Sequence, residues 1–164
     1  MIHPHSGAGT LNTALVADPS PAARRAASHL LERLGFRVAC ASGSEEALAL
    51  IAGTMPDLLL VDGRLEAPNG GLLAEVIRRL PGGPGFCLFH VTGDAAPASV
   101  RRAMEAGADD YLVKPFDEAL LGFKLAQART RGRLDGRRSH LRLVQDNSAA
   151  GATAWRFGLF GKAV

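Results

Sequence analysis

The chain has 164 residues, a length that suits one ordinary globular domain with an extension. Its hydrophobic content of 47% is mostly aliphatic, since only 5% of the residues are aromatic. No apolar run approaches the ~20 residues of a membrane helix, so we expect a cytoplasmic protein without membrane insertion.

The formal net charge of +3 is distributed unevenly. Residues 1–128 hold 11 basic and 14 acidic side chains, whereas residues 129–164 hold 8 basic and 2 acidic ones. The basic excess therefore belongs to the C-terminal segment and favours an anionic partner there. We expect a disordered leader at 1–10, a domain at 11–130, and an Arg-rich tail at 131–164 that stays disordered until it is bound.

Short aliphatic runs alternate with amphipathic stretches of helical length along the predicted domain. The first half predicts a strand at Leu11–Val16, a helix from Pro19 or Pro21 to Gly35, a strand at Phe36–Cys40, a helix that begins with a capping box of Ser42 and Glu45 and ends at Gly53, and a strand at Leu58–Val61. The second half predicts a helix at Gly71–Leu80, a strand at Phe86–Val91, a helix at Ala98–Ala106, a strand at Tyr111–Val113, and a helix from Asp117 to about Arg131.

Five strands that alternate with five helices predict an α/β fold, a doubly wound parallel sheet with helices on both faces. Right-handed crossovers leave few topologies, and the flavodoxin-like order 2-1-3-4-5 is favoured. Cys40 and Cys87 fall in strands that are predicted to be buried. We therefore expect two packing thiols rather than a disulfide.

Polar residues follow four of the predicted strands at their carboxyl ends. They are Asp18, Asp62, Thr92 and Lys114. Ligands bind at this edge of doubly wound sheets, so these side chains are expected to converge. Carboxylates suit Mg²⁺, and the metal and a lysine ammonium would neutralise charge on a transferring phosphoryl group. One polar residue after a strand is more often loop chemistry, but the whole set predicts a magnesium and phosphoryl site.

Four segments carry a family resemblance. LVADPSPAARR, PDLLLVDGRLEAPNGG, FHVTGD and AGADDYLVKPFD resemble CheY-like receivers of two-component response regulators, over about residues 11–130. The resemblance implies that Asp62 accepts a phosphoryl group from a histidine kinase or a phosphotransfer protein. It also implies Mg²⁺ ligands at Asp18, Asp62 and the main-chain carbonyl of Arg64, a phosphoryl partner at Lys114, switch residues at Thr92 and Tyr111, and a cis bond before Pro115.

Two positions depart from the receiver pattern. Receivers usually carry two adjacent acids after the first strand. Here we interpret Ala17 as the position of the first acid, which leaves Asp18 as the only one. The proline that usually stands four residues after the phosphoacceptor is Glu66. Since Mg²⁺ affinity depends on the number of charged ligands, the missing acid should weaken metal binding.

The tail is rich in arginine, with seven Arg to one Lys from residue 129 onward. Arginine suits bidentate recognition of phosphate and guanine, and the single tryptophan suits base stacking. The patterns RxxxR (138–142) and DxSxxG (146–151) resemble the cyclic di-GMP signature of PilZ domains, without their β-barrel. The candidate ligand residues are Arg131, Arg133, Arg137, Arg138, Arg142, Asp146, Asn147, Ser148, Gly151, Trp155 and Arg156.

A receiver followed by such a tail resembles the CheY-like cyclic di-GMP effectors of the Cle group. This resemblance implies a non-enzymatic signalling module that binds cyclic di-GMP and acts on a flagellar motor switch protein, with recruitment to the motor or cell pole. Two alternatives stay open: a stand-alone phosphorelay receiver whose tail is incidental, and a tail that binds nucleic acid or a membrane surface. Specific DNA binding is disfavoured, because no helix-turn-helix pattern is present.

Overall fold

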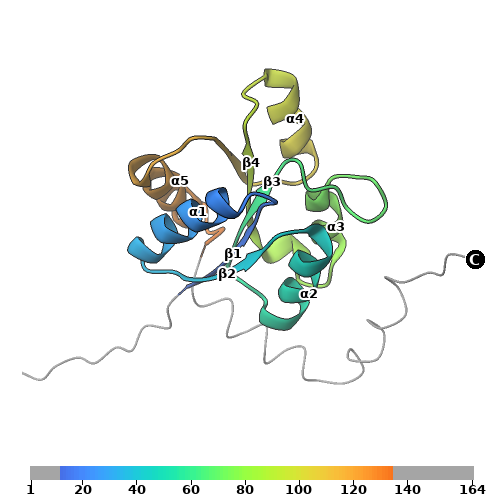
Figure 1. The fold of residues 1–164 in the computed structure, drawn as a ribbon, viewed down its shortest axis with the longest axis horizontal. Coiled ribbons are helices and arrows are strands. Elements are labelled where there is room, and N and C mark those ends of the chain that lie inside the picture. Colours follow the sequence, from blue (N-terminus) through green and yellow to red (C-terminus); the bar gives the residue numbers. More distant parts are fainter. Residues whose placement is uncertain (1–11, 135–164) are drawn as a thin grey trace, which may run out of the picture.

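A computed structural model describes residues 12–134, and residues 1–11 and 135–164 lie outside the described part (Figure 1). The five strands are β1 (Thr13–Ala17), β2 (Arg37–Ala41), β3 (Leu58–Asp62), β4 (Cys87–Thr92) and β5 (Asp110–Val113). The helices are α1 (Pro21–Arg33), α2 (Ser44–Thr54), α3 (Leu73–Arg79), α4 (Pro97–Glu105) and α5 (Glu118–Thr130), with a short 3₁₀ helix η1 (Gly83–Gly85). All strand pairs are parallel and the order is β2-β1-β3-β4-β5, which confirms the predicted topology.

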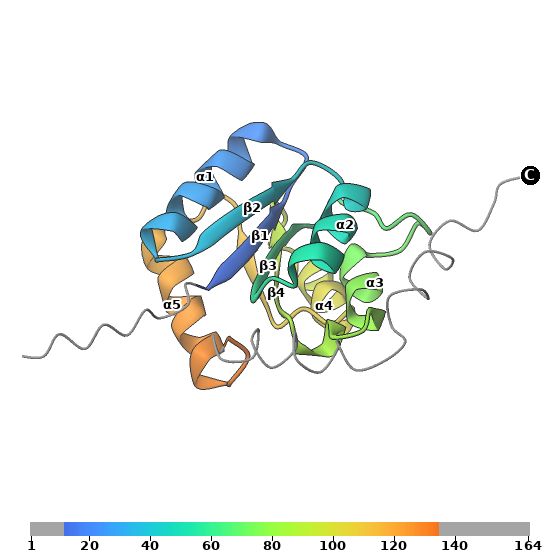
Figure 2. The ribbon, with the colours of Figure 1, turned by 90° about the horizontal axis from the view of Figure 1, so that it is seen from below.

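Two helical layers cover the sheet, with α1 and α5 on one face and α2 and α3 on the other (Figure 2). The central strand β3 explains this arrangement, because successive side chains of a strand point to opposite faces. Leu58 and Leu60 pack against the α1 and α5 side, whereas Leu59 and Val61 pack against the α2 and α3 side. A continuous apolar strand therefore needs a layer on each face, as the sequence predicted.

The start and end of α2 differ from the sequence prediction. The capping box of Ser42 with Glu45 is wrong, because both the main-chain N and Oγ of Ser42 donate to Oε2 of Glu46, each at 2.8 Å. The helix also continues through Gly53 and stops at Met55, whose φ of 47° is left-handed. Such a residue ends a helix without any need for glycine at that point.

The two cysteines are both free, but their environments differ. Cys87 on β4 is buried, and burial raises the pKa of its thiol to about 12. Cys40 is exposed, which corrects the prediction of a buried thiol. It lies on β2, and β2 is an edge strand with only β1 beside it.

The chain stays packed beyond α5. Nε of Arg133 lies 2.6 Å from Oδ1 of Asp109, and its Nη2 lies 2.8 Å from the carbonyl oxygen of Phe86. Leu134 is only 3% exposed and joins the α1 and α5 side of the core. The packed unit thus reaches residue 134, four residues past the predicted boundary. Among the described helices, none is long and apolar enough to cross a membrane.

Candidate functional site

An acidic pocket lies at the carboxyl ends of the central strands. Asp18 follows β1 directly, and Asp62 is the last residue of β3. Both are nearly inaccessible, at 4% and 2% exposure respectively. Because a charge removed from water needs compensation, the partners of these two carboxylates define the chemistry of the pocket.

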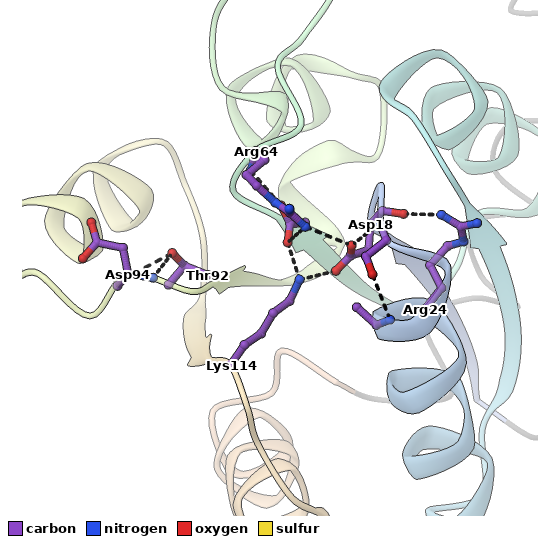
Figure 3. Close-up of polar contacts among 9 residues, drawn as sticks. Asp18, Arg24, Arg64, Thr92, Asp94 and Lys114 are labelled. Carbon is purple, nitrogen blue, oxygen red and sulfur yellow. Dashed lines mark hydrogen bonds and ion pairs between the residues drawn. The ribbon is translucent and has the colours of Figure 1, made fainter.

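Lys114 joins the two carboxylates. Its Nζ donates to Oδ2 of Asp18 and to Oδ2 of Asp62, so one ammonium is shared between them (Figure 3). Lys114 follows β5, and the bond to Pro115 is cis, as the resemblance implied. Of the four strand-end residues that were predicted to converge, Asp18, Asp62 and Lys114 are therefore in direct contact.

A second cation reaches the same pair. The main-chain N of Arg64 lies 2.8 Å from Oδ1 of Asp62, and Nε lies 2.9 Å from the same oxygen. Nη2 lies 3.4 Å from Oδ1 of Asp18 and 3.4 Å from Oδ2 of Asp62. The sequence placed only the main-chain carbonyl of Arg64 in the pocket, so the role of its side chain was missed. Its position two residues after Asp62 was the available signal.

These contacts decide the ionisation of Asp62. Burial on its own raises the pKa of this carboxyl, but hydrogen bonds from Arg64 and Lys114 outweigh burial and lower the pKa to about 2. Asp62 is therefore a carboxylate at neutral pH. An ionised and positioned carboxylate is what a phosphoacceptor requires.

The loop between β1 and α1 holds Asp18 in place. Oδ1 of Asp18 accepts from the main-chain N of Ser20 at 2.8 Å, and its carbonyl accepts from Nη1 of Arg24 at 2.6 Å. Ser20 is also the N-cap of α1, since its Oγ accepts from the N of Ala23 at 3.3 Å. The same short segment thus starts the helix and orients the carboxylate.

Thr92 ends β4 but does not contact either carboxylate in the described structure. Its Oγ1 accepts from the main-chain N of Asp94 at 2.9 Å (Figure 3). The Asp94 carboxylate in turn binds Oγ of Ser99 at 2.5 Å and the N of Ala96 at 2.8 Å. The hydroxyl of Thr92 is therefore bound to the loop that leads into α4, and Figure 3 shows it on the opposite side of Lys114 from Asp18.

Tyr111 lies on β5 and is half-buried. Nζ of Lys124, on α5, lies 4.7 Å from the centre of its ring. The same nitrogen is 2.5 Å from Oδ1 of Asp110. A cation over the ring and an ion pair beside it hold the aromatic side chain against α5.

His90 and Gly63 form a close contact that the sequence did not predict. A Cβ on Gly63 would lie 2.7 Å from Cε1 and Nε2 of His90, so only glycine fits after Asp62. His90 is buried on β4, and burial lowers the pKa of its imidazole against the opposing effect of Asp62. Its side chain lines a cavity of about 230 Å³ together with Asp62, Thr92 and Arg102.

Comparison with known proteins agrees with this geometry. The model of the response regulator receiver domain matches residues 14–125. The chain belongs to this family. Receiver domains are generally signalling domains rather than enzymes.

The transcriptional regulatory protein AfsQ1 of Streptomyces coelicolor is 32% identical to the chain over 118 residues, which is 72% of the chain and 51% of that protein. A gliding motility regulatory protein of Myxococcus xanthus is 34% identical over 100 residues, 61% of the chain and 13% of that protein. The chain thus spans about half or less of these two relatives. A solved CheY-like receiver domain protein from Methanospirillum hungatei JF-1 is 29% identical, with a TM-score of 0.63, and the match covers 72% of the chain and 93% of that structure.

The receiver's missing acid is at a different position from the one expected. β1 ends at Ala17, so the two residues after the strand are Asp18 and Pro19. Ala17 is 1% exposed and packs in the core on the α2 and α3 side, whereas Pro19 is exposed. The interpretation that Ala17 replaces the acid is therefore wrong, and Pro19 stands in that place.

Receiver domains typically bind Mg²⁺ at this pocket. The oxygen atoms of Asp18 and Asp62 are of the kind that Mg²⁺ prefers, but both carboxylates already share two cations. Within residues 12–134, no group of three or more His, Cys, Asp or Glu side chains is arranged to hold a metal ion. Because Lys114 and Arg64 already pair with both carboxylates, the pocket as the structure describes it fits a tightly held divalent ion poorly.

The predicted ligand residues of the tail are only partly within the described range. Arg131 is exposed at the end of α5, whereas Arg133 is tied to Asp109 and to main-chain carbonyls. The remaining candidates lie outside the described residues: Arg137, Arg138, Arg142, Asp146, Asn147, Ser148, Gly151, Trp155 and Arg156.

Proposed function

We propose that this receiver accepts a phosphoryl group on Asp62 from a histidine kinase or a phosphotransfer protein. The observation that carries the proposal is the state of Asp62, an ionised carboxylate at a strand end with Lys114 beside it. Its Oδ1 accepts from the main-chain N and from Nε of Arg64, whereas its Oδ2 accepts from Lys114 and, at 3.4 Å, from Nη2 of Arg64. We propose Oδ2 as the attacking atom, because it lies against the ammonium that would stabilise the incoming phosphoryl group.

The transfer would proceed by displacement at phosphorus. Oδ2 of Asp62 forms the new O–P bond, and the P–N bond of a phosphohistidine donor breaks. The imidazole leaves with the bonding electron pair and takes up a proton from solvent. Lys114 would then lie beside the phosphoryl oxygens and stabilise their charge, as a positioned cation does in phosphoryl transfer.

The output would depend on Thr92 and Tyr111. For the Thr92 hydroxyl to donate to a phosphoryl group on Asp62, it must give up the hydrogen bond that it donates to the Asp94 carbonyl at 3.2 Å and the one that it accepts from the N of Asp94. Both hydrogen bonds join Thr92 to the loop before α4, so a change at Thr92 would move this loop. Tyr111 lies on the neighbouring strand and is the second candidate for the switch.

The experiment uses the full chain and phosphoramidate, a small donor with a P–N bond. We expect the intact mass to increase by one phosphoryl group, and Asp62→Asn to abolish the increase. Glu105→Gln is the control, because Glu105 is exposed on α4 away from the pocket. Circular dichroism checks that each variant is folded. An unmodified wild-type chain, or a labelled Asp62→Asn, would contradict the proposal.

A second proposal concerns the tail, and its support is the sequence pattern alone. We propose that Arg131 and residues after 134 bind cyclic di-GMP, and that the complex acts on a partner such as a flagellar motor switch protein. Arg133 is not included, because its guanidinium is engaged in the receiver. The alternatives remain a tail that binds nucleic acid or no ligand.

Calorimetry with cyclic di-GMP tests this second proposal. Arg138→Ala or Arg142→Ala should weaken binding by about 5- to 150-fold, since a bidentate Arg–guanine contact is worth roughly 1–3 kcal/mol. Asp146→Asn and Trp155→Ala should also weaken it, whereas Lys162→Ala should have little effect. Equal binding of cyclic di-AMP would indicate a nonspecific basic tail instead.

A further inference from the structure

We propose that Arg64 is the resident cation of the phosphoryl pocket and competes with divalent metal for Asp18 and Asp62. The guanidinium takes the place that a metal ion would occupy between the two carboxylates. Divalent metal then binds only by displacing it. This inference concerns metal binding and does not depend on whether Asp62 is phosphorylated.

The geometry supports a specific role for the guanidinium. One planar group touches Oδ1 of Asp62 through Nε and reaches both Asp18 and Asp62 through Nη2. The fork of donors contacts both oxygens of Asp62 and one oxygen of Asp18, whereas the ammonium of Lys114 contacts one oxygen of each carboxylate. The main-chain N of Arg64 also donates to Asp62, which fixes the base of the side chain beside its target.

The charges of the pocket balance without a metal ion. Asp18 and Asp62 supply two negative charges, and Lys114 and Arg64 supply two positive ones. Arg24 also comes close, but it donates to the carbonyl of Asp18 and leaves the carboxylate to the other cations. Mg²⁺ affinity follows the negative charge of its ligands, so a neutral pocket attracts the ion weakly.

The exposure of Arg64 makes the contact displaceable. Its side chain is 65% exposed, whereas those of Asp18 and Asp62 are 6% and 3% exposed. The guanidinium therefore reaches the pocket from the surface and covers it. A side chain that contacts the protein on one side and solvent on the other can move away without disturbing the core. A high concentration of Mg²⁺ should therefore displace the Arg64 guanidinium from the two carboxylates.

Calorimetric titration of the full chain with MgCl₂ tests the inference. Arg64→Gln keeps most of the side-chain length but removes the charge, and it should bind Mg²⁺ about 5- to 10-fold more tightly than the wild type. Arg64→Lys keeps the charge but not the fork, and its affinity should lie between the two. The matched control is Arg79→Gln, since Arg79 is exposed on α3. It should bind like the wild type.

A second titration locates the ion. Asp18→Asn combined with Arg64→Gln should lose the gain in affinity, because one of the two shared carboxylates is then neutral. Equal Mg²⁺ affinity in wild type and Arg64→Gln would overturn the inference. An equal gain in Arg79→Gln would overturn it as well, because the effect would then reflect net charge alone. Phosphoramidate labelling of Arg64→Gln is read separately and reports on Asp62 as acceptor.

Discussion

The guanidinium of Arg64 contacts Asp18, a residue 46 positions earlier in the chain, with 3.4 Å between Nη2 and Oδ1. This contact ties the loop after β1 to the loop after β3 across the mouth of the pocket. Lys114, the residue after β5, donates to the same two carboxylates. The receiver thus holds its acidic pair with two cations from its own chain.

The low pKa of Asp62 predicts a pH-dependent contribution to stability. The pKa is about 2 in the folded chain against an ordinary value of 3.8. A carboxyl whose pKa falls on folding contributes stability that is present above the unfolded pKa and is lost as pH falls through the folded pKa. Urea unfolding should show the free energy of the wild type, relative to Asp62→Asn, decreasing by on the order of 2 kcal/mol between about pH 4 and pH 2. A constant difference across this range would show that the two cations do not stabilise the carboxylate.

The contact between Gly63 and His90 predicts a destabilising methyl group. Gly63→Ala places a Cβ 2.7 Å from the imidazole, so we expect a loss of about 1–3 kcal/mol in the free energy of unfolding. His90→Ala in the same chain should recover part of that loss. Gly53→Ala serves as the control, because nothing lies within 4 Å of its Cβ and alanine favours a helix. Additive effects in the double variant would argue against the contact.

Arg133 and Arg131 should differ in their effects on stability. Arg133 bonds to Asp109 and to the carbonyl of Phe86, so Arg133→Ala should lower the free energy of unfolding by about 1–3 kcal/mol. Arg131 is exposed, and Arg131→Ala should change it by less than about 0.5 kcal/mol. Chemical unfolding of the two variants measures the difference. If Arg133→Ala leaves stability unchanged but removes cyclic di-GMP binding, then Arg133 is a ligand residue after all.

Position 19 should accept the second acid of a receiver, and position 17 should not. Pro19→Asp adds a carboxylate at the open end of β1, so Mg²⁺ should bind more tightly, because affinity rises with ligand charge. Ala17→Asp buries an unpaired charge in the core and should destabilise the chain instead. Calorimetry with MgCl₂ and thermal unfolding separate the two outcomes. Tighter binding in Ala17→Asp with an intact fold would reverse the assignment.

The fold and the strand-end residues could be predicted from the sequence. The apolar run at β3 fixes a strand that is covered on both faces, and parallel strands bring their carboxyl ends to one edge. That rule is sufficient to predict that Asp18, Asp62 and Lys114 lie close together, without any knowledge of side-chain directions.

Side-chain directions explain what the sequence could not predict. Arg64 has a long side chain that can point to solvent or back into the pocket, and only the neighbouring carboxylates decide between these. The position of the missing acid was predicted one residue away from its place, at Ala17 instead of Pro19. The reason is that the end of β1 decides which of these two residues follows the strand at the pocket. Cys40 was misjudged because the burial of a strand depends on its place in the sheet, and β2 is at the edge.

Chemical trapping of the acyl phosphate identifies the phosphorylated residue itself. The full chain is treated with phosphoramidate, and borohydride then reduces the acyl phosphate, which converts the modified aspartate to homoserine. Peptide mass spectrometry reads the position. We predict homoserine at position 62 and at no other aspartate. Homoserine at Asp18, or a chain in which every aspartate is unchanged, would contradict the central claim that Asp62 is the phosphoacceptor.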